Sequence, residues 1–461
     1  MKFNKMTDIP EAVMQIIKTL NNNHHQAYIV GGSVRDMILG KPAHDWDITT
    51  DATPQEVTKI FEAENIRVIP TGEAFGTVMI HLNDEDYEVT TFRLESNYED
   101  FRRPTAVSFS KSIEEDLARR DFSINAMAFS PITNELIDPF GGQEDLKNGV
   151  IKAVGRPEER FREDALRLMR AIRFASRYGF EIDEDTKHAI KRNADRIRYV
   201  SAERVKKEID GILMSSTPSI GVQLLHDLGL LKIIIPEVDI LDEVPQASKW
   251  HSKNVWGHTL DVIDGTPANL DVRWTTLLHD IGKEKARVRD ETGRDRFIGH
   301  DKISGELSVQ VMKRLKFDNT SIQKISRLIY LHGAEPEKRN KLKHFLRHLG
   351  AENLENWHEM RQADIKAHHP DTVEHGIQGY LKRKAILDDI LAKGEPYAIS
   401  HLNIDGNDLI AFGIPAGPII GKILRELLNL VIINPNKNNK AFLKSWAINN
   451  WRRIRKENEI Q

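Results

Sequence analysis

The spacing of hydrophobic residues changes along the chain. Short apolar runs with alternating or β-branched residues predict strands in the first part, at 27–32, 44–50, 76–82 and 86–94. After about residue 158, apolar residues recur three and four positions apart, as in 163–175 and 201–214, which predicts helices. We therefore expect an α/β head that ends near residue 150, followed by a helical remainder.

Two local signals refine this division. The segment 53–63 predicts a helix inside the head, because Thr53 can cap it, Pro54 suits its first position and Glu56 completes a capping box. The segment 130–149 is rich in turn residues, which predicts an irregular link between the head and the helices.

Composition limits the class of protein. The 461 residues have a net charge of −3 and contain no cysteine, which excludes disulfides and thiolate metal sites. We find no apolar run of the ~18 residues that a membrane helix needs and no signal-peptide core, so we expect a cytoplasmic protein without membrane contact. The near-neutral charge predicts that any nucleic-acid surface is a local patch. The basic segment 436–456, with two tryptophans, is equally consistent with such a patch and with a solvated final helix.

Asp45 and Asp47 are the first candidate functional residues. Side chains two apart on a strand share a face, so these carboxylates would repel each other unless a cation lay between them. Mg²⁺ is commonly held by one or two carboxylates together with substrate phosphates. Upstream, the pair Gly31–Gly32 allows close approach of a bulky anion, and Arg35 adds positive charge in the first turn of a helix expected to begin near Ser33. Each feature alone is commonly structural.

Together, however, the G-G-x-V-R-D run and the following D-x-D-x-x-T run resemble a known signature. It belongs to class II nucleotidyltransferases of the DNA polymerase β superfamily, which include bacterial CCA-adding tRNA nucleotidyltransferases and poly(A) polymerases. The resemblance implies a head with a small mixed sheet in which Asp45 and Asp47 hold Mg²⁺ for catalysis. It also implies nucleotide binding by Gly32 and Arg35, and a third carboxylate, for which Glu88 is the candidate.

Two further segments of the head extend the resemblance. The charged segment 91–109 is similar to the flexible loop of CCA-adding enzymes, which favours addition of the full CCA sequence. The run "RRDFSINA" is expected to open a helix whose apolar face includes Ile124, Met127 and Phe129. By resemblance, Arg120 contacts the nucleotide phosphates, and Asp121 and Asn125 lie near the ribose.

The predicted helix 163–175 matches the base-selecting motif of the family. Glu163, Asp164 and Arg167 are spaced to meet on one surface, which Arg170 and Arg173 extend. The resemblance implies nucleotide binding by Asp164 and these three arginines. Cytosine and adenine both present an amino donor beside a ring acceptor, which a carboxylate and an arginine can match, whereas uracil and guanine present a carbonyl. The "ERVKKE" run that begins at Glu203 also matches a family helix, for which we expect a structural role.

The helical remainder carries a histidine–aspartate series that resembles the HD phosphohydrolase domain. The resemblance implies that His258, His279, Asp280 and Asp364 are ligands of a divalent metal such as Mn²⁺, Ni²⁺ or Co²⁺. His300 and His332 would serve a second metal or bind phosphate. Two readings stay open, a retained phosphodiesterase or phosphatase and an inherited scaffold that supports RNA.

The expected domains are a nucleotidyltransferase head at 1–150, a base-selecting neck at 151–215, an HD-type body at 216–380 and a tRNA-binding tail at 381–461. In the tail, Pro418 suits a helix start, and the residues that could contact tRNA are Lys437, Lys440, Arg452, Arg453 and Arg455. The leading hypothesis is CCA addition to the tRNA 3′ end from CTP and ATP, with no obligate protein partner. Alternatives are an A-only or CC-only adder, a poly(A) polymerase, a metal-dependent phosphohydrolase with a nucleotide-binding head, and an RNA-binding module.

Overall fold

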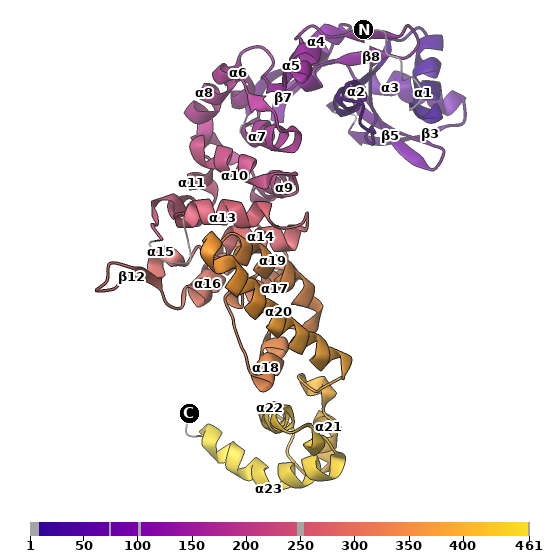
Figure 1. Ribbon diagram of the computed structural model, residues 1–461. Coiled ribbons are helices and arrows are strands. Elements are labelled where there is room, and N and C mark those ends of the chain that lie inside the picture. Colours follow the sequence, from indigo (N-terminus) through magenta and orange to yellow (C-terminus); the bar gives the residue numbers. More distant parts are fainter. Residues whose placement is uncertain (1–8, 73–74, 100–102, 247–252, 460–461) are drawn as a thin grey trace. The chain divides into compact units, whose positions relative to one another are not determined.

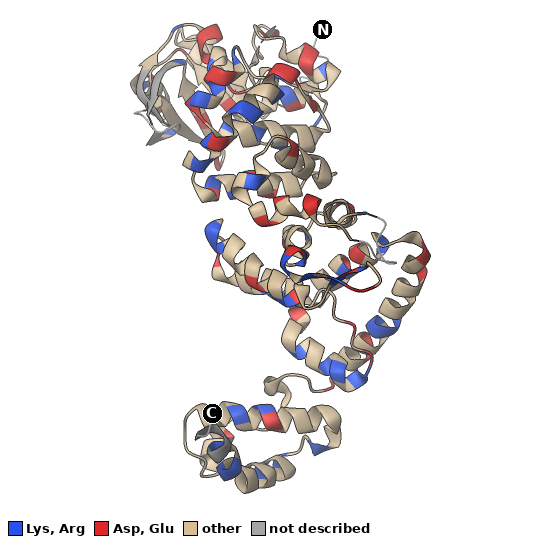
Figure 2. Cartoon of the chain, turned by 90° about the vertical axis from the view of Figure 1, so that its left-hand side faces the viewer, with Lys and Arg blue, Asp and Glu red and all other residues tan. Residues whose placement is uncertain are grey.

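The computed structural model describes residues 9–72, 75–99, 103–246 and 253–459. The chain forms two compact units, one of residues 1–239 with 314–316 and one of residues 240–313 with 317–461 (Figure 1). Within the described ranges, no helix combines the length and the apolar character required to cross a membrane. Basic and acidic residues are interspersed along the ribbon (Figure 2), as expected for a chain of small net charge.

The first unit contains a seven-stranded sheet in the order β3-β4-β5-β2-β1-β8-β9. Strands β2 and β5 are parallel, whereas the other neighbouring pairs are antiparallel, so the predicted small mixed sheet is confirmed. The strands are β1 (Ala27–Val30), β2 (Asp47–Thr50), β3 (Arg67–Gly72), β4 (Thr77–Leu82), β5 (Glu85–Thr91), β8 (Ala128–Ser130) and β9 (Glu135–Ile137).

Five described helices belong to this part of the chain, and the first three pack directly on strands of the sheet. They are α1 (Glu11–Asn22), α2 (Gly32–Ile38), α3 (Pro54–Ala63), α4 (Ile113–Ala118) and α5 (Gly142–Asn148). Helix α1 buries Val13, Ile16 and Leu20 and packs on β1 and α3. The predicted capping box of α3 is confirmed, because the Thr53 side chain accepts from the backbone of Glu56 and the Glu56 carboxylate accepts from the backbone of Thr53.

The segment 91–109, expected to be a charged loop, contains two paired strands. Strands β6 (Arg93–Glu99) and β7 (Arg103–Phe109) form a separate antiparallel hairpin in which Arg93 pairs with Phe109. Residues 100–102 of this predicted loop lie outside the described residues. Backbone hydrogen bonds between the strands therefore replace the irregular chain that composition favoured.

Three local predictions are wrong in detail. Strand β2 begins at Asp47, so Asp45 precedes the strand. The "RRDFSINA" run does not open a helix, because α4 ends at Ala118 and the chain passes through a 3-10 turn, η3 (Ser123–Asn125), into β8. The helix expected at 163–175 is broken at Asp164, which takes an extended conformation between α6 and α7. In the last two cases, tertiary contacts outweigh the local helical pattern: the 121–128 segment leads into β8, and Asp164 pairs with Arg204.

Helices complete the first unit. They are α6 (Pro157–Glu163), α7 (Leu166–Tyr178), α8 (Glu184–Asn193), α9 (Ala202–Leu213), α10 (Pro218–Asp227), α11 (Leu231–Ile234) and α12 (Pro236–Asp239), with a short parallel pair β10 (Val150–Ile151) and β11 (Glu181–Ile182). Helix α7 buries Leu168, Met169 and Ile172 and packs against α9 and α10. Its other face carries the arginines predicted to bind nucleotide.

The second unit is almost wholly helical in its described part. Its helices are α13 (Val255–Asp264), α14 (Leu270–Leu278), α15 (Lys283–Ala286), α16 (His300–Arg314), α17 (Asn319–Tyr330), α18 (Arg339–Leu349), α19 (Leu354–Lys366), α20 (Pro370–Ala392), α21 (Gly406–Ala411), α22 (Pro418–Ile433) and α23 (Lys440–Glu459). A hairpin, β12 (Arg287–Arg289) with β13 (Asp295–Phe297), precedes α16. Leu346, Trp357 and Leu387 belong to the core beneath α18–α20, and Leu427 and Leu443 to that of the tail.

Candidate active site and a histidine–aspartate cluster

The acidic pair lines a cavity of about 670 Å³ in the first unit. Asp47 is the first residue of β2 and pairs with Val30 of β1, and Asp45 lies two residues before it. All the residues that the sequence predicts to bind nucleotide line the same cavity: Gly32, Arg35, Arg120, Asp121, Asn125, Asp164, Arg167, Arg170 and Arg173. Side chains up to 169 positions apart, from Arg35 to Arg204, thus surround one space.

The two aspartates are electrostatically unfavourable neighbours. Burial, followed by the charges of Asp45 and of Glu88 on β5, raises the pKa of Asp47 to about 6, and the Arg120 guanidinium opposes this rise. The protein groups therefore do not neutralise the pair. This excess of carboxylate charge fits a divalent cation with oxygen ligands.

The glycine turn before α2 leaves room beside these carboxylates. Gly31 has a φ of +74°, and a Cβ there would lie 3.0 Å from Nη1 of Arg120 and 3.6 Å from Oδ2 of Asp47. Arg35 on α2 is buried, and its Nη1 donates to Oδ1 of Asn125 at 2.6 Å. This hydrogen bond joins α2 to η3 beside the cavity.

Asp121 organises the arginine side of the cavity. Its Oδ1 accepts from the backbone of Phe122 at 2.8 Å and from Asn125 at 3.1 Å, and its Oδ2 accepts from Nε of Arg170 at 2.7 Å. Burial alone would raise the pKa of this carboxyl, but Arg170 and the other donors lower the pKa to about 2. Asp121 is therefore ionised and fully engaged by protein groups.

The expected pair of Glu163 and Arg167 forms, but the side chain of Asp164 has a different partner from the one expected. Asp164 accepts from Arg204 of α9 at 2.8 Å, whereas Arg167 donates to Glu163 at 2.5 Å and to the backbone oxygen of Arg119 at 2.8 Å. Asp164 and Arg167 still line the cavity together. The contact that holds Asp164 comes from a residue 40 positions away.

Apart from Gly31, Asp45 and Asp47, seven cavity-lining residues were not among the predicted nucleotide-binding residues: Phe75, Arg93, Arg119, Leu166, Phe174, Arg177 and Arg204. Arg177 could have been found, because it continues the arginine row of α7 four residues beyond Arg173. Phe174 lies among these cations, with the Arg173 guanidinium 4.4 Å from its ring centre. Neither Phe75 nor Arg93 has a comparable sequence signal.

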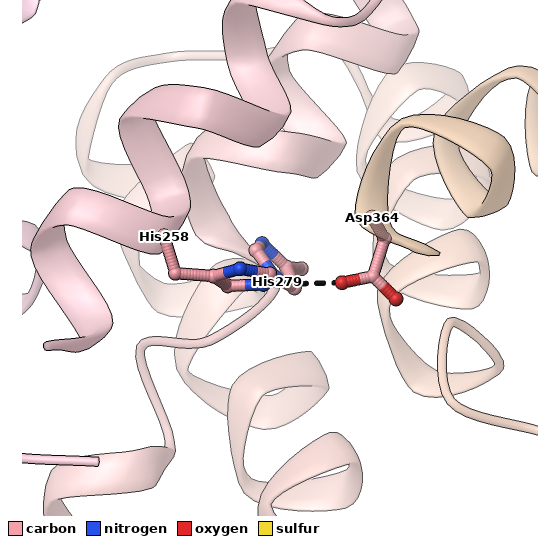
Figure 3. Close-up of side chains that lie close together, drawn as sticks. All are labelled: His258, His279 and Asp364. Carbon is pink, nitrogen blue, oxygen red and sulfur yellow. Dashed lines mark hydrogen bonds and ion pairs between the residues drawn. The ribbon is translucent and has the colours of Figure 1, made fainter. Parts of the chain in front are cut away.

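The second unit contains the predicted cluster of histidines and aspartates. His258 of α13, His279 at the end of α14 and Asp364 of α19 point toward one another (Figure 3), and their potential ligand atoms lie within 4.8 Å of one another. His258 Nε2 is 3.1 Å from Oδ1 of Asp364, and His279 Nε2 is 3.1 Å from Oδ2 of Asp280. All four predicted ligands are buried.

A second trio adjoins the first. Asp280, His300 and His332 also bring their potential ligand atoms within 4.8 Å of one another, with the two Nε2 atoms 3.2 Å apart. Burial, and then the charges of His279 and His300, lower the pKa of His332 to about 3, so this imidazole is neutral. A neutral imidazole is the form that binds a metal. The prediction that His300 and His332 join the cluster is thus consistent with their positions.

Comparisons with known proteins agree across the chain. Family models match for the poly A polymerase head domain at residues 27–152, the "Probable RNA and SrmB- binding site of polymerase A" at 179–241 and "tRNA nucleotidyltransferase domain 2" at 298–447. The CCA-adding enzyme of Lactiplantibacillus plantarum is 35% identical over 451 residues, covering 96% of this chain and 97% of that protein. That of Enterococcus faecalis is 33% identical over 452 residues, covering 96% and 97%.

The chain belongs to the family of CCA-adding enzymes. Among solved structures, the Bacillus stearothermophilus CCA-adding enzyme in complex with CTP has a TM-score of 0.68 and 28% identity, covering 97% of this chain and 98% of that one. The Thermotoga maritima CCA-adding enzyme complexed with tRNA_CCA has a TM-score of 0.57 and 20% identity, covering 96% of both chains, and supports the fold alone.

Family membership makes the chain a nucleotidyltransferase and implies the use of a divalent metal. The raised pKa of Asp47 supports Asp45 and Asp47 as ligands, since a bound cation would offset the repulsion of their charges. The histidine–aspartate cluster offers a second, chemically different set of donors, in which imidazoles predominate.

Several residues of the basic segment 436–456 already have partners within the tail. Trp446 and Trp451 of α23 pack against the apolar core of the tail, so they are partly buried. The Lys440 ammonium lies 2.7 Å from Asp408, and the Lys437 ammonium lies 5.3 Å from the Phe442 ring centre. The tRNA contacts expected of Lys437, Lys440, Arg452, Arg453 and Arg455 stay predictions.

Proposed function

We propose that this protein adds C, C and A to the 3′ end of tRNA, using CTP and ATP and releasing pyrophosphate. The observation that carries this proposal is the single cavity shared by the acidic pair and the predicted nucleotide-binding residues. Its relatives support it, since the CCA-adding enzymes with known structures include complexes with CTP, with ATP and with tRNA_CCA.

The residues divide the chemistry between them. Asp45 and Asp47 would hold Mg²⁺, which supplies charge stabilisation at the reacting phosphate when bound. The 3′-hydroxyl of the RNA loses its proton to solvent as its oxygen attacks the α-phosphorus. The bond between this phosphorus and the oxygen that bridges to the β-phosphate breaks, so pyrophosphate leaves. The glycine turn leaves space for the triphosphate, and Arg35 and Arg120 provide positive charge beside it.

We assign the choice of base to the segment 151–215. Asp164 can accept from the amino group of cytosine or adenine, and Arg167 can donate to the ring acceptor beside it. The Arg204 ion pair supports this assignment, because it fixes the carboxylate of Asp164 at the edge of the cavity. A base with a carbonyl in place of the amino group would leave Asp164 without a donor from the base.

The test is extension of tRNA that lacks its 3′ end, with CTP and ATP offered separately and together. Addition of C, C and A from the mixture is the expected result. CC alone or A alone selects a partial adder, and a long A-tract selects poly(A) synthesis. Asp47→Asn should abolish transfer with either nucleotide.

A second function, metal-dependent phosphate-ester hydrolysis, is favoured by the buried histidine–aspartate cluster. His258, His279, Asp280 and Asp364 would hold the metal, which activates water when bound. The direct test is hydrolysis of 2′,3′-cyclic AMP with Mn²⁺, Ni²⁺ or Co²⁺. Activity that is lost in Asp280→Asn and kept in Asp45→Asn supports this function, and no turnover with any of the three metals leaves the cluster as a scaffold.

A further inference from the structure

A cavity of about 900 Å³ adjoins the histidine–aspartate cluster in the second unit. It is formed by α19, α20 and the loop 331–338, and its volume is within the range of sites for small organic ligands. His300 of the cluster and His368, whose Nε2 is 3.7 Å from Asp364, both line it. The cavity therefore opens directly beside the candidate metal ligands.

Two buried arginines dominate the wall of this cavity. Arg361 of α19 and Arg383 of α20 are each more than nine-tenths buried in their side chains. The Nε atoms of both guanidinium groups have no hydrogen-bond partner within the described part of the chain. Gly379, one helical turn before Arg383, also lines the cavity, and a Cβ there would lie 3.5 Å from Nη1 of Arg383. With glycine at this position, no side chain of residue 379 lies over the guanidinium.

One carboxylate oxygen now lies between the two guanidinium groups. Oε1 of Glu335 accepts from Nη2 of Arg361 at 2.5 Å and from Nη2 of Arg383 at 3.0 Å. Glu335 belongs to the loop 331–338, and its side chain is 52% exposed. The buried guanidinium groups need an anionic partner, whereas the half-exposed Glu335 carboxylate can be solvated by water when another anion takes its place. Two buried cations arranged around one exchangeable oxygen form a receptor for an oxyanion, and guanidinium groups match phosphate in shape and charge.

Arg361 also connects this receptor to the cluster. Its Nη1 donates to Oδ2 of Asp364 at 2.6 Å, while the other oxygen of Asp364 faces His258. Arg361 would therefore contact both the bound phosphate and Asp364, which is a candidate metal ligand. Lys382, which also lines the cavity, adds positive charge.

We propose that Arg361 and Arg383 bind the phosphoryl group of a nucleotide-sized phosphate ester, displacing Glu335, and so form the substrate site of the histidine–aspartate cluster. As a substrate site it rests on the proposed hydrolase function, whereas anion binding itself does not. The occupant is a phosphate ester rather than free phosphate, because the cavity is much larger than one phosphate and includes the apolar side chains Ile365 and Ile386.

The experiment is calorimetric titration of the full-length, metal-free chain with 2′,3′-cyclic AMP, and in parallel with inorganic phosphate. Arg383→Gln should weaken binding of the cyclic nucleotide about tenfold or more, since a charge-assisted hydrogen bond is lost. Glu335→Gln should tighten binding about threefold or more, since the internal competitor is removed. Lys384→Gln is the matched control, because Lys384 is on the same helix and pairs with Asp388 at 2.8 Å.

Each outcome decides a separate statement. Unchanged or weaker binding in Glu335→Gln would overturn the proposal, because a purely structural ion pair gives that result. Equal affinity for inorganic phosphate and the cyclic nucleotide would overturn the nucleotide-sized ligand. If Arg383→Gln does not fold, the half-exposed Glu335 position still tests the site. If binding follows the expected pattern but Mn²⁺ brings about no hydrolysis, only the proposed hydrolase function is overturned. If hydrolysis occurs and is unaffected by Arg383→Gln, only the proposed substrate site is overturned.

Discussion

Replacement of Asp47 by asparagine should stabilise the metal-free protein while it abolishes nucleotidyl transfer. Asp47 is held beside Asp45 and near Glu88, and burial and these charges raise its pKa from 3.8 to about 6. One pKa unit corresponds to about 1.4 kcal/mol, so the shift corresponds to about 3 kcal/mol at most. Partial solvent access reduces the expected gain in unfolding free energy to about 1–2 kcal/mol at pH 7.5.

The sign of the pH dependence follows from the raised pKa. Between pH 4 and 6 the folded protein binds more protons at Asp47 than the unfolded chain, so stability falls as the pH rises through this range. The advantage of Asp47→Asn should therefore be largest above pH 6 and disappear near pH 4. Added Mg²⁺ at one hundred times Kd should reverse the order, because binding at that concentration stabilises the wild type by about 2.7 kcal/mol.

The assay is hydrogen–deuterium exchange of peptides spanning β1 and β2 across a urea series, with and without Mg²⁺. Asp84→Asn is the matched control, since Asp84 is an exposed aspartate of the turn between β4 and β5. Two results would refute the reasoning: a metal-free Asp47→Asn protein no more stable than wild type, or equal stabilisation of both by Mg²⁺. The first would mean that the carboxylates do not repel each other, and the second that they do not hold the metal.

Three further predictions concern the same cavity. Asp121 has a pKa of about 2, below its unfolded value, so its ionised form contributes about 2 kcal/mol to the free energy of unfolding. This contribution should be lost as the pH falls from 4 through 2, and the urea unfolding curves of wild type and Asp121→Asn should converge there. Gly31→Ala should lower the free energy of unfolding by about 1–2 kcal/mol in urea, because the φ of this residue is positive. It should also raise the KM for CTP, because the new Cβ would crowd Arg120. An unchanged KM would show that the turn tolerates a side chain. Arg204→Gln should increase incorporation of U and G relative to C and A in a primer-extension assay, because Asp164 loses its ion-pair partner, whereas Lys207→Gln on the exposed face of the same helix should not.

Local features of this protein were readable from the sequence. The capping box of α3, the buried face of α7 and the shared environment of Asp45 and Asp47 depend on backbone geometry that operates over three or four residues. The resemblance to a nucleotidyltransferase family then added longer-range information, since it placed Arg120 and Arg167 at the same site, which the structure also does.

Partners distant in sequence were decided only by the tertiary structure. The pattern of 163–175 favoured one continuous helix in which Asp164 meets Arg167, but the chain breaks there and Asp164 pairs with Arg204. Likewise, nothing in the local sequence brings Glu335 between Arg361 and Arg383, which come from two different helices. Periodicity determines which face of an element is buried, whereas packing of the elements against one another determines which side chains meet on the other face.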